Sequence, residues 1–187
     1  MHGDDDLIRP HGGYRDLKSF QMSEIVFDGT VKFCERFVDR FSRTTDQMVQ
    51  AARSGRQNIA EGSQVSGTSK KTELKLVSVA RGSLEELLLD YEDFLRQREL
   101  KKWEKDSKEA LFVRKLGVQE NRSYSTYKTY FEKAETETAA NAAICVIHQA
   151  NYLLDQQLRA LEKGFLEEGG FTERLYRVRS QARKERK

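Results

Sequence analysis

The sequence predicts an all-α protein: an antiparallel up-down four-helix bundle with a helical insertion before its fourth helix and a basic C-terminal extension. Three observations support this fold. Pro10 is the only proline among 187 residues, so no later residue forbids a helix. Apolar residues recur at steps of three and four over long stretches, without the alternation typical of half-buried strands. The 10 Phe and 7 Tyr are enough to fill a core.

Composition excludes several classes of protein. No run approaches the roughly 20 apolar residues of a membrane span. Residues 1–13, which we expect to form a flexible leader, are acidic and glycine-rich and do not resemble a secretion signal. We therefore expect a soluble, cytoplasmic protein with no membrane partner. Cys34 and Cys145 lie far apart within apolar helical patterns, which indicates buried thiols in a reducing compartment.

The bundle is expected over residues 14–168, and its first helix over about Asp16 to Phe41. One apolar stripe defines the core face of this helix: Leu17, Phe20, Phe27, Val31, Cys34, Val38 and Phe41. Three further apolar residues lie beside this stripe: Val26, Phe33 and Phe37. A bundle interior uses one seam, so this surplus predicts contacts between subunits of a closed homo-oligomer.

The second and third helices are predicted from their caps and stripes. Thr44 and Gln47 have the spacing of a capping box, which predicts a helix start near Thr45, and Gly62 is expected to end that helix. After a polar loop, a third helix is expected from Lys70 to about Glu99. Its core stripe consists of Leu74, Val77, Leu84, Leu88, Tyr91 and Leu95.

Residues from about 100 to 136 form an insertion. A small helix is expected around Lys108 to Leu116, closed by Gly117. Four aromatic residues then fall three and four apart: Tyr124, Tyr127, Tyr130 and Phe131. Such a face packs the insertion onto the bundle or forms a docking surface for a partner.

The fourth bundle helix is expected from about Glu137 to Lys163, with Gly164 as its end. A basic tail follows over residues 169–187. From Phe171 onward it holds seven Arg or Lys residues against two Glu residues, a net charge of +5 in a chain whose total is +3. All the net positive charge therefore lies in this segment, as expected of a mobile arm that binds a polyanion.

Catalytic patterns are missing from the sequence. His2 and His11 lie in the expected leader, and His148 lies among apolar residues, where a core or interface histidine is expected. There is no HExxH motif, no paired-cysteine cluster, no glycine-rich phosphate loop and no nucleophile elbow. We predict no enzymatic activity, no catalytic residue, no bound metal and no cofactor.

Polar residues interrupt the second and third helices where a simple bundle needs none. The predicted structural network consists of Asn58, Glu61, Arg81, Ser83 and Glu86. Arg81 lies on an apolar stripe and requires an anionic partner, for which Glu61 and Glu86 are the candidates. The network fixes helix register or a subunit interface, or alternatively binds a ligand. Gly82 costs about 1 kcal/mol relative to Ala in mid-helix, which indicates close approach of another backbone.

These residues also carry a resemblance. The segment IAEG at 59–62, the lysines at 70 and 71, and ARGSLEEL at 80–87 resemble the bacterial four-helix bundle family of 23S ribosomal RNA intervening-sequence proteins. The accessory variability determinant of diversity-generating retroelements is similar to that family. The likeness extends over roughly residues 14 to 98, and the insertion and tail look like an extended, suffix-bearing branch.

The resemblance implies an antiparallel bundle that assembles as a ring-shaped homopentamer without enzymatic activity. In the retroelement member, a basic surface binds nucleic acid and the reverse transcriptase. Family members often have a proline before the NIAEG segment, where this chain has Gly55, Arg56 and Gln57. This departure predicts a straighter second helix.

Two functions follow as hypotheses. The first is a nucleic-acid-binding accessory protein that contacts RNA or DNA phosphates through charge, without reading sequence. Its candidate contacts are Arg53, Arg56, Lys70, Lys71, Lys75, Arg174, Arg177, Arg179, Arg183 and Lys184. The second is an oligomeric scaffold whose insertion and tail bind a protein, for example a reverse transcriptase, with no nucleic-acid role.

Overall fold

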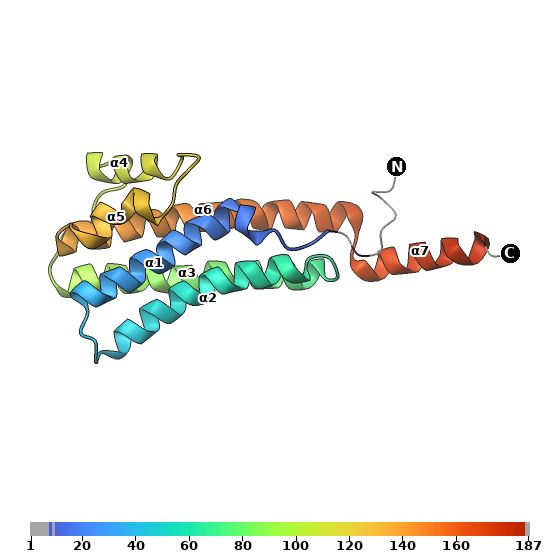
Figure 1. Ribbon diagram of the computed structural model, residues 1–187, viewed down its shortest axis with the longest axis horizontal. Coiled ribbons are helices and arrows are strands. Elements are labelled where there is room, and N and C mark those ends of the chain that lie inside the picture. The colour runs from blue at the N-terminus through green and yellow to red at the C-terminus, as the bar shows by residue number, and fades with distance from the viewer. Residues whose placement is uncertain (1–7, 9, 186–187) are drawn as a thin grey trace.

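The computed structural model describes residue 8 and residues 10–185, and that part of the chain is helical without any strand (Figure 1). The other positions of the expected leader, including His2, and the last two residues of the tail, Arg186 and Lys187, lie outside the described residues. The elements are the 3-10 turn η1 (Tyr14–Asp16) and the helices α1 (Lys18–Phe37), α2 (Arg43–Val65), α3 (Lys70–Gln97), α4 (Lys108–Leu116), α5 (Tyr124–Glu132), α6 (Thr136–Glu168) and α7 (Phe171–Glu185).

Four long helices enclose the core. α1 packs against α2 and α6, and α3 packs against the same two helices, so each long helix has two neighbours among the other three (Figure 1). Their shared interior is apolar and tightly closed, with Phe33, Leu84 and Ile147 among its fully buried residues. None of the helices in the described residues has a stretch long and apolar enough to cross a membrane.

α1 ends four residues earlier than predicted. The backbone turns extended at Val38, and Phe41 lies in the following loop with its side chain 81% exposed. Its assignment to the core stripe was therefore wrong. Ser42 then starts α2 by accepting a hydrogen bond from the backbone N–H of Thr44 at 3.2 Å, so Ser42 takes the capping role that the sequence placed on Thr44.

The apolar surplus of α1 was assigned wrongly to an interface. Val26 and Phe33 are buried within this chain, and the Phe33 ring meets the rings of Tyr91 and Phe94 edge-on at 4.8 and 4.9 Å. α1 also contacts α5, so its buried arc is wider than one seam. These residues give no support for contacts between subunits.

Two predicted helix ends shift because the glycines lie inside the helices. α2 continues past Gly62 to Val65, and a Cβ at Gly62 would make an ordinary contact with α3, 3.5 Å from the Glu73 carbonyl oxygen. α6 continues through Gly164, and Gly169 ends it with φ +73, in the left-handed region.

The insertion packs onto the body of the protein, by which we mean the four long helices α1, α2, α3 and α6. α4 covers the helix predicted around Lys108 to Leu116 and lies against α6, and α5 lies against α1. Tyr127 and Phe131 are fully buried, and the Phe131 ring lies against the backbone of Gly29 in α1. Arg36 donates hydrogen bonds to the carbonyl oxygens of Phe131 and Ala134 at 2.7 and 2.9 Å. The aromatic face is thus a packing seam.

Both cysteines are free, buried thiols, as predicted. Burial raises the pKa of Cys34 to about 12 and the pKa of Cys145 to about 11. Thiols with such pKa values are almost fully protonated at neutral pH and therefore poor nucleophiles.

Candidate nucleic-acid interface

The basic tail forms a helix. The sequence predicted a mobile arm, but α7 spans Phe171–Glu185 and projects beyond the end of the body at which α2 turns into α3 (Figure 1). Glu173 supports the helix start, because its carboxylate accepts a hydrogen bond from the Gly170 N–H at 2.6 Å. The cations on α7 are therefore held in a helical arrangement.

Four cationic side chains on α7 are exposed: Arg177, Arg179, Arg183 and Lys184. Arg179 and Arg183 are four residues apart, and Arg177 and Lys184 are seven apart, so each pair shares one side of the helix. The two pairs lie on different sides. α7 therefore presents positive charge around much of its circumference, not along one stripe.

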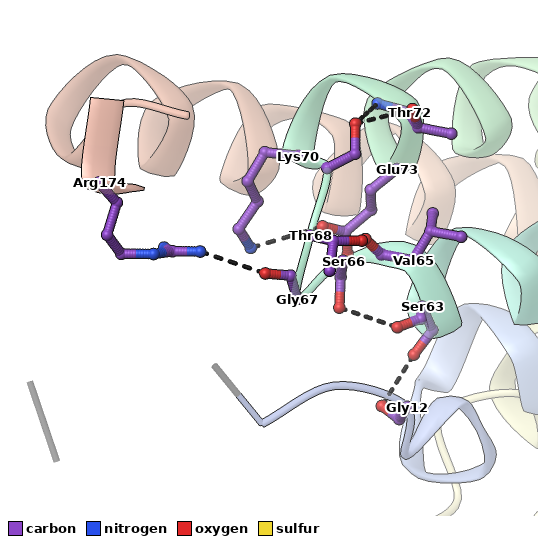
Figure 2. Close-up of polar contacts among 11 residues, drawn as sticks. Gly12, Ser63, Val65, Ser66, Gly67, Thr68, Lys70, Thr72, Glu73 and Arg174 are labelled. Carbon is purple, nitrogen blue, oxygen red and sulfur yellow. Dashed lines mark hydrogen bonds and ion pairs between the residues drawn. The ribbon is translucent and has the colours of Figure 1, made fainter. Parts of the chain in front are cut away.

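Arg174 does not belong to the exposed set. Only 8% of it is exposed, and its guanidinium donates a hydrogen bond to the carbonyl oxygen of Gly67 at 3.2 Å (Figure 2). Gly67 is itself buried in the loop between α2 and α3. The prediction that Arg174 contacts phosphate is thus corrected, since its side chain is used to attach α7 to the body.

The loop that receives Arg174 is fixed by its own hydrogen bonds. The Val65 carbonyl accepts from the backbone N–H groups of Thr68 and Ser69 at 3.1 and 2.9 Å. The hydroxyl of Ser63 donates to the Gly12 carbonyl at 2.8 Å, and the Gly12 N–H donates back to the Ser63 carbonyl at 3.0 Å (Figure 2). The segment before η1, the α2–α3 loop and the start of α7 therefore meet at one end of the molecule.

The lysines at the start of α3 lie at this same end. Lys70 forms an ion pair with Glu73 at 3.4 Å, so its charge is partly compensated within the chain. Burial raises the pKa of Glu73 above its ordinary value, against the opposing effect of Lys70. Lys71 and Lys75 are exposed. The start of α3 and the start of α7 thus lie at the same end of the protein, from which α7 projects away from the body (Figure 1).

The α2 arginines are separate from that end. Arg56 stacks its guanidinium 4.2 Å from the centre of the Phe27 ring and is half-buried. Its charge lowers the pKa of Asp28, although burial of that carboxyl has the larger and opposite effect. Arg53 is exposed, but it lies twelve positions before Val65, about 18 Å along the helix axis. These two residues do not extend the surface formed by α7.

The polar network exists with different partners. Arg81 donates to Glu85 at 2.6 Å and to Asp155 of α6 at 3.2 Å, whereas Glu61 and Glu86, the predicted partners, are exposed. Asn151 of α6 also donates to Glu85, at 3.2 Å.

A second group in the network joins α2 to α3. The hydroxyls of Ser54 and Ser83 lie 2.9 Å apart, and Asn58 donates to the Ser54 carbonyl at 2.8 Å. In both groups, these hydrogen bonds join residues of one helix or of two helices of the same chain. They therefore favour the interpretation that the polar residues fix the register of the helices.

Two other features bear on function. His148 is exposed on α6, so of the two predicted roles, a core or an interface histidine, the first is wrong and the second stays a prediction; Glu85 and Glu92 lie near it. A cleft of about 530 Å³ lies between α1 and the segment before α5, lined by Glu24, Asp28, Glu120 and Arg122 among others. Three carboxylates against one guanidinium make this cleft unsuitable for phosphate. Within the described residues, no three His, Cys, Asp or Glu side chains group as metal ligands would.

Comparison with known proteins places no constraint on the function. No family model, curated protein or solved structure matches the chain.

Proposed function

We propose that this protein is a non-enzymatic, oligomeric accessory protein of the cytoplasm that binds nucleic acid through charge, without sequence specificity. The observation that carries the proposal is the position of α7. Its four exposed cations lie on a helix that projects from the body (Figure 1). No other helix in the described part of the chain combines such an excess of exposed positive charge with so few neighbours.

The chemistry of this surface suits a phosphate backbone. Guanidinium groups donate two parallel hydrogen bonds to phosphate, and displacement of counterions from the polyanion drives association. Each neutralised phosphate adds about 0.9 to the salt slope on duplex DNA, so four contacts give a slope of about 4. Tyr176 is also exposed on α7, where its ring can stack on an unpaired base without selecting one.

The proposal includes the bundle and its assembly. We infer that α1, α2, α3 and α6 form an antiparallel up-down four-helix bundle of the kind found in intervening-sequence proteins, and that five copies form a ring. The packing of these four helices around one core supports the bundle. The ring rests on the resemblance. In a ring, several α7 helices act on one polyanion, and the resulting avidity compensates for weak single contacts.

Fluorescence anisotropy with a labelled duplex of arbitrary sequence tests this function over a series of salt concentrations. The binding variant carries glutamine at the four exposed α7 cations, Arg177, Arg179, Arg183 and Lys184. A matched control carries glutamine at four exposed lysines of the insertion: Lys105, Lys108, Lys115 and Lys133. Both variants lose four positive charges, but only the first is expected to lose affinity and most of the salt slope. Equal losses in both would contradict a role for α7.

A protein-binding scaffold is the second candidate, and one observation favours it. Leu166 near the end of α6 and Leu175 and Tyr176 on α7 are exposed apolar side chains beside the cations. Such a mixed surface also suits a protein partner, such as the reverse transcriptase that the resemblance implies. Absence of nucleic-acid binding by the intact chain at low salt would favour this function over the first.

A further inference from the structure

The outward face of α3 is a straight line of exposed residues. They are Lys71, Lys75, Ser78, Gly82, Glu86, Leu89 and Asp93, spaced at steps of three and four along the helix. That spacing keeps them on one side of an α-helix over about six turns. On its other sides α3 packs against α2 and α6.

The positions on this face are arranged symmetrically about Gly82, and its charges are divided between its two halves. Lys71 and Asp93 lie eleven residues before and after the glycine, Lys75 and Leu89 lie seven, and Ser78 and Glu86 lie four. The cations are all in the first half of the face and the acids are all in the second.

A further carboxyl group lies beside the acidic half of this face. Asp90 lies next to it, and its pKa is raised by burial and by the nearby carboxylates of Asp93 and Glu86. Asp93 also pairs with Arg96 at 2.7 Å, but both side chains are exposed, and such pairs are weak and readily exchanged.

Among the residues that the structure describes, none packs against the centre of the face. A Cβ at Gly82 would meet no atom within 4 Å. Glycine is unfavourable in a helix interior, and a glycine retained there usually allows another backbone to approach. Val79 and Leu89, with 44% and 55% exposure, add aliphatic surface on either side of it.

We propose that this face binds the same face of a second copy of the chain, with the two α3 helices antiparallel and crossing at Gly82. The antiparallel arrangement places Lys71 and Lys75 of each copy along the acidic half of the α3 face of the other copy. A parallel arrangement would align like charges. The contact is self-complementary, so it has two-fold symmetry.

Two consequences follow from the symmetry. The assembly contains an even number of copies: two if this contact acts alone, and ten if it joins two five-membered rings. The α7 helices of the paired copies also lie toward opposite ends of the pair, because α7 starts beside the beginning of α3 in each copy.

Gly82→Arg tests the contact directly. The new side chain meets open space in the single chain, so the fold is retained, but it blocks the approach of a second α3. Light scattering at micromolar concentration is expected to show the mass halved relative to the wild-type protein, with helicity by circular dichroism unchanged. Gly164→Arg is the matched control, because that helical glycine of α6 also has no neighbour within 4 Å, and it should leave the mass unchanged.

A charge exchange provides an independent test. Asp93→Lys places two lysines opposite each other at both ends of the contact and should raise the dissociation constant at least tenfold at low salt. Combining it with Lys71→Asp restores opposite charges and should recover most of the affinity. A monomeric or strictly pentameric wild-type protein, an unchanged mass for Gly82→Arg, or no recovery in the double variant would overturn the proposal. None of these outcomes depends on nucleic-acid binding.

Discussion

The guanidinium of Arg174 and the carbonyl oxygen of Gly67 form a hydrogen bond at 3.2 Å between residues 107 positions apart. This bond connects the basic helix α7 to the loop between α2 and α3. A guanidinium that is almost completely buried contributes to stability through its hydrogen bonds, and these are lost if a shorter side chain replaces it. Arg174 therefore helps to hold the start of α7 against the body.

Arg174→Ala should loosen α7 without unfolding the body. Hydrogen bonds to charged groups contribute roughly 1.5–3 kcal/mol, so local opening of residues 171–185 should become at least tenfold more frequent. Hydrogen exchange of the α7 amides measures this opening. Arg177→Ala is the control, because Arg177 is exposed on the same helix. Equal protection of α7 in both variants would show that Arg174 is not its anchor.

The sequence predicted which segments are helical better than it predicted what single residues contact. α4 matches its predicted bounds, and α3 starts where its stripe and the polar loop indicated, because local periodicity carries that information. Phe41 and Phe33 were misassigned because a stripe does not reveal where a helix stops or how many neighbours cover it. Arg174 was indistinguishable from the other tail arginines, since its burial depends on a loop more than 100 residues away.

Arg81→Ala should lower stability only modestly. The sequence placed Arg81 on an apolar stripe with an anionic partner, but the side chain of Arg81 is 30% exposed and those of Glu85 and Asp155 are 46% and 45% exposed. Solvent screens the carboxylates that are left behind, so we expect a loss of about 1 kcal/mol or less in the free energy of unfolding. Urea denaturation measures it, with Arg96→Ala in the exposed pair with Asp93 as the reference. A loss above about 3 kcal/mol would indicate a truly buried network.

Gly29→Ala should destabilise the packing of α5 on α1. A Cβ at position 29 would lie 2.5 Å from the Phe131 ring, which is buried and has little room to move. Overpacking of this kind typically costs about 1–3 kcal/mol. Gly82→Ala is the opposite case, because its Cβ would meet no atom of residues 10–185 within 4 Å and alanine is the better helix former, by about 1 kcal/mol. Thermal unfolding of both variants, compared at a concentration where the chain is monomeric, should show shifts of opposite sign.

Glu73 should make stability depend on pH. Burial raises the pKa of this carboxyl above 4.5 in the folded chain, so the folded state holds the proton more tightly than the unfolded state does. The free energy of unfolding therefore falls as the pH rises and Glu73 loses its proton. The destabilisation by the buried carboxylate remains at neutral pH. Glu73→Gln removes the charge and should raise the melting temperature at pH 7, with the gain disappearing below about pH 4. A gain of the same size at both pH values would exclude titration of Glu73 as its cause.

Deletion of residues 171–187 should abolish most of the nucleic-acid affinity while leaving the body folded. The deleted segment contains the four exposed cations of α7, and none of its described residues belongs to the apolar core formed by α1, α2, α3 and α6, so that core remains intact. The four exposed α7 cations account for a salt slope of about 4, so the deletion should remove most of the slope that the full chain shows. Anisotropy titrations at several salt concentrations give both slopes, and circular dichroism confirms that the helices persist. An affinity that survives the deletion unchanged would mean that the body carries the binding surface, and α7 would then be better explained as a docking helix for a protein.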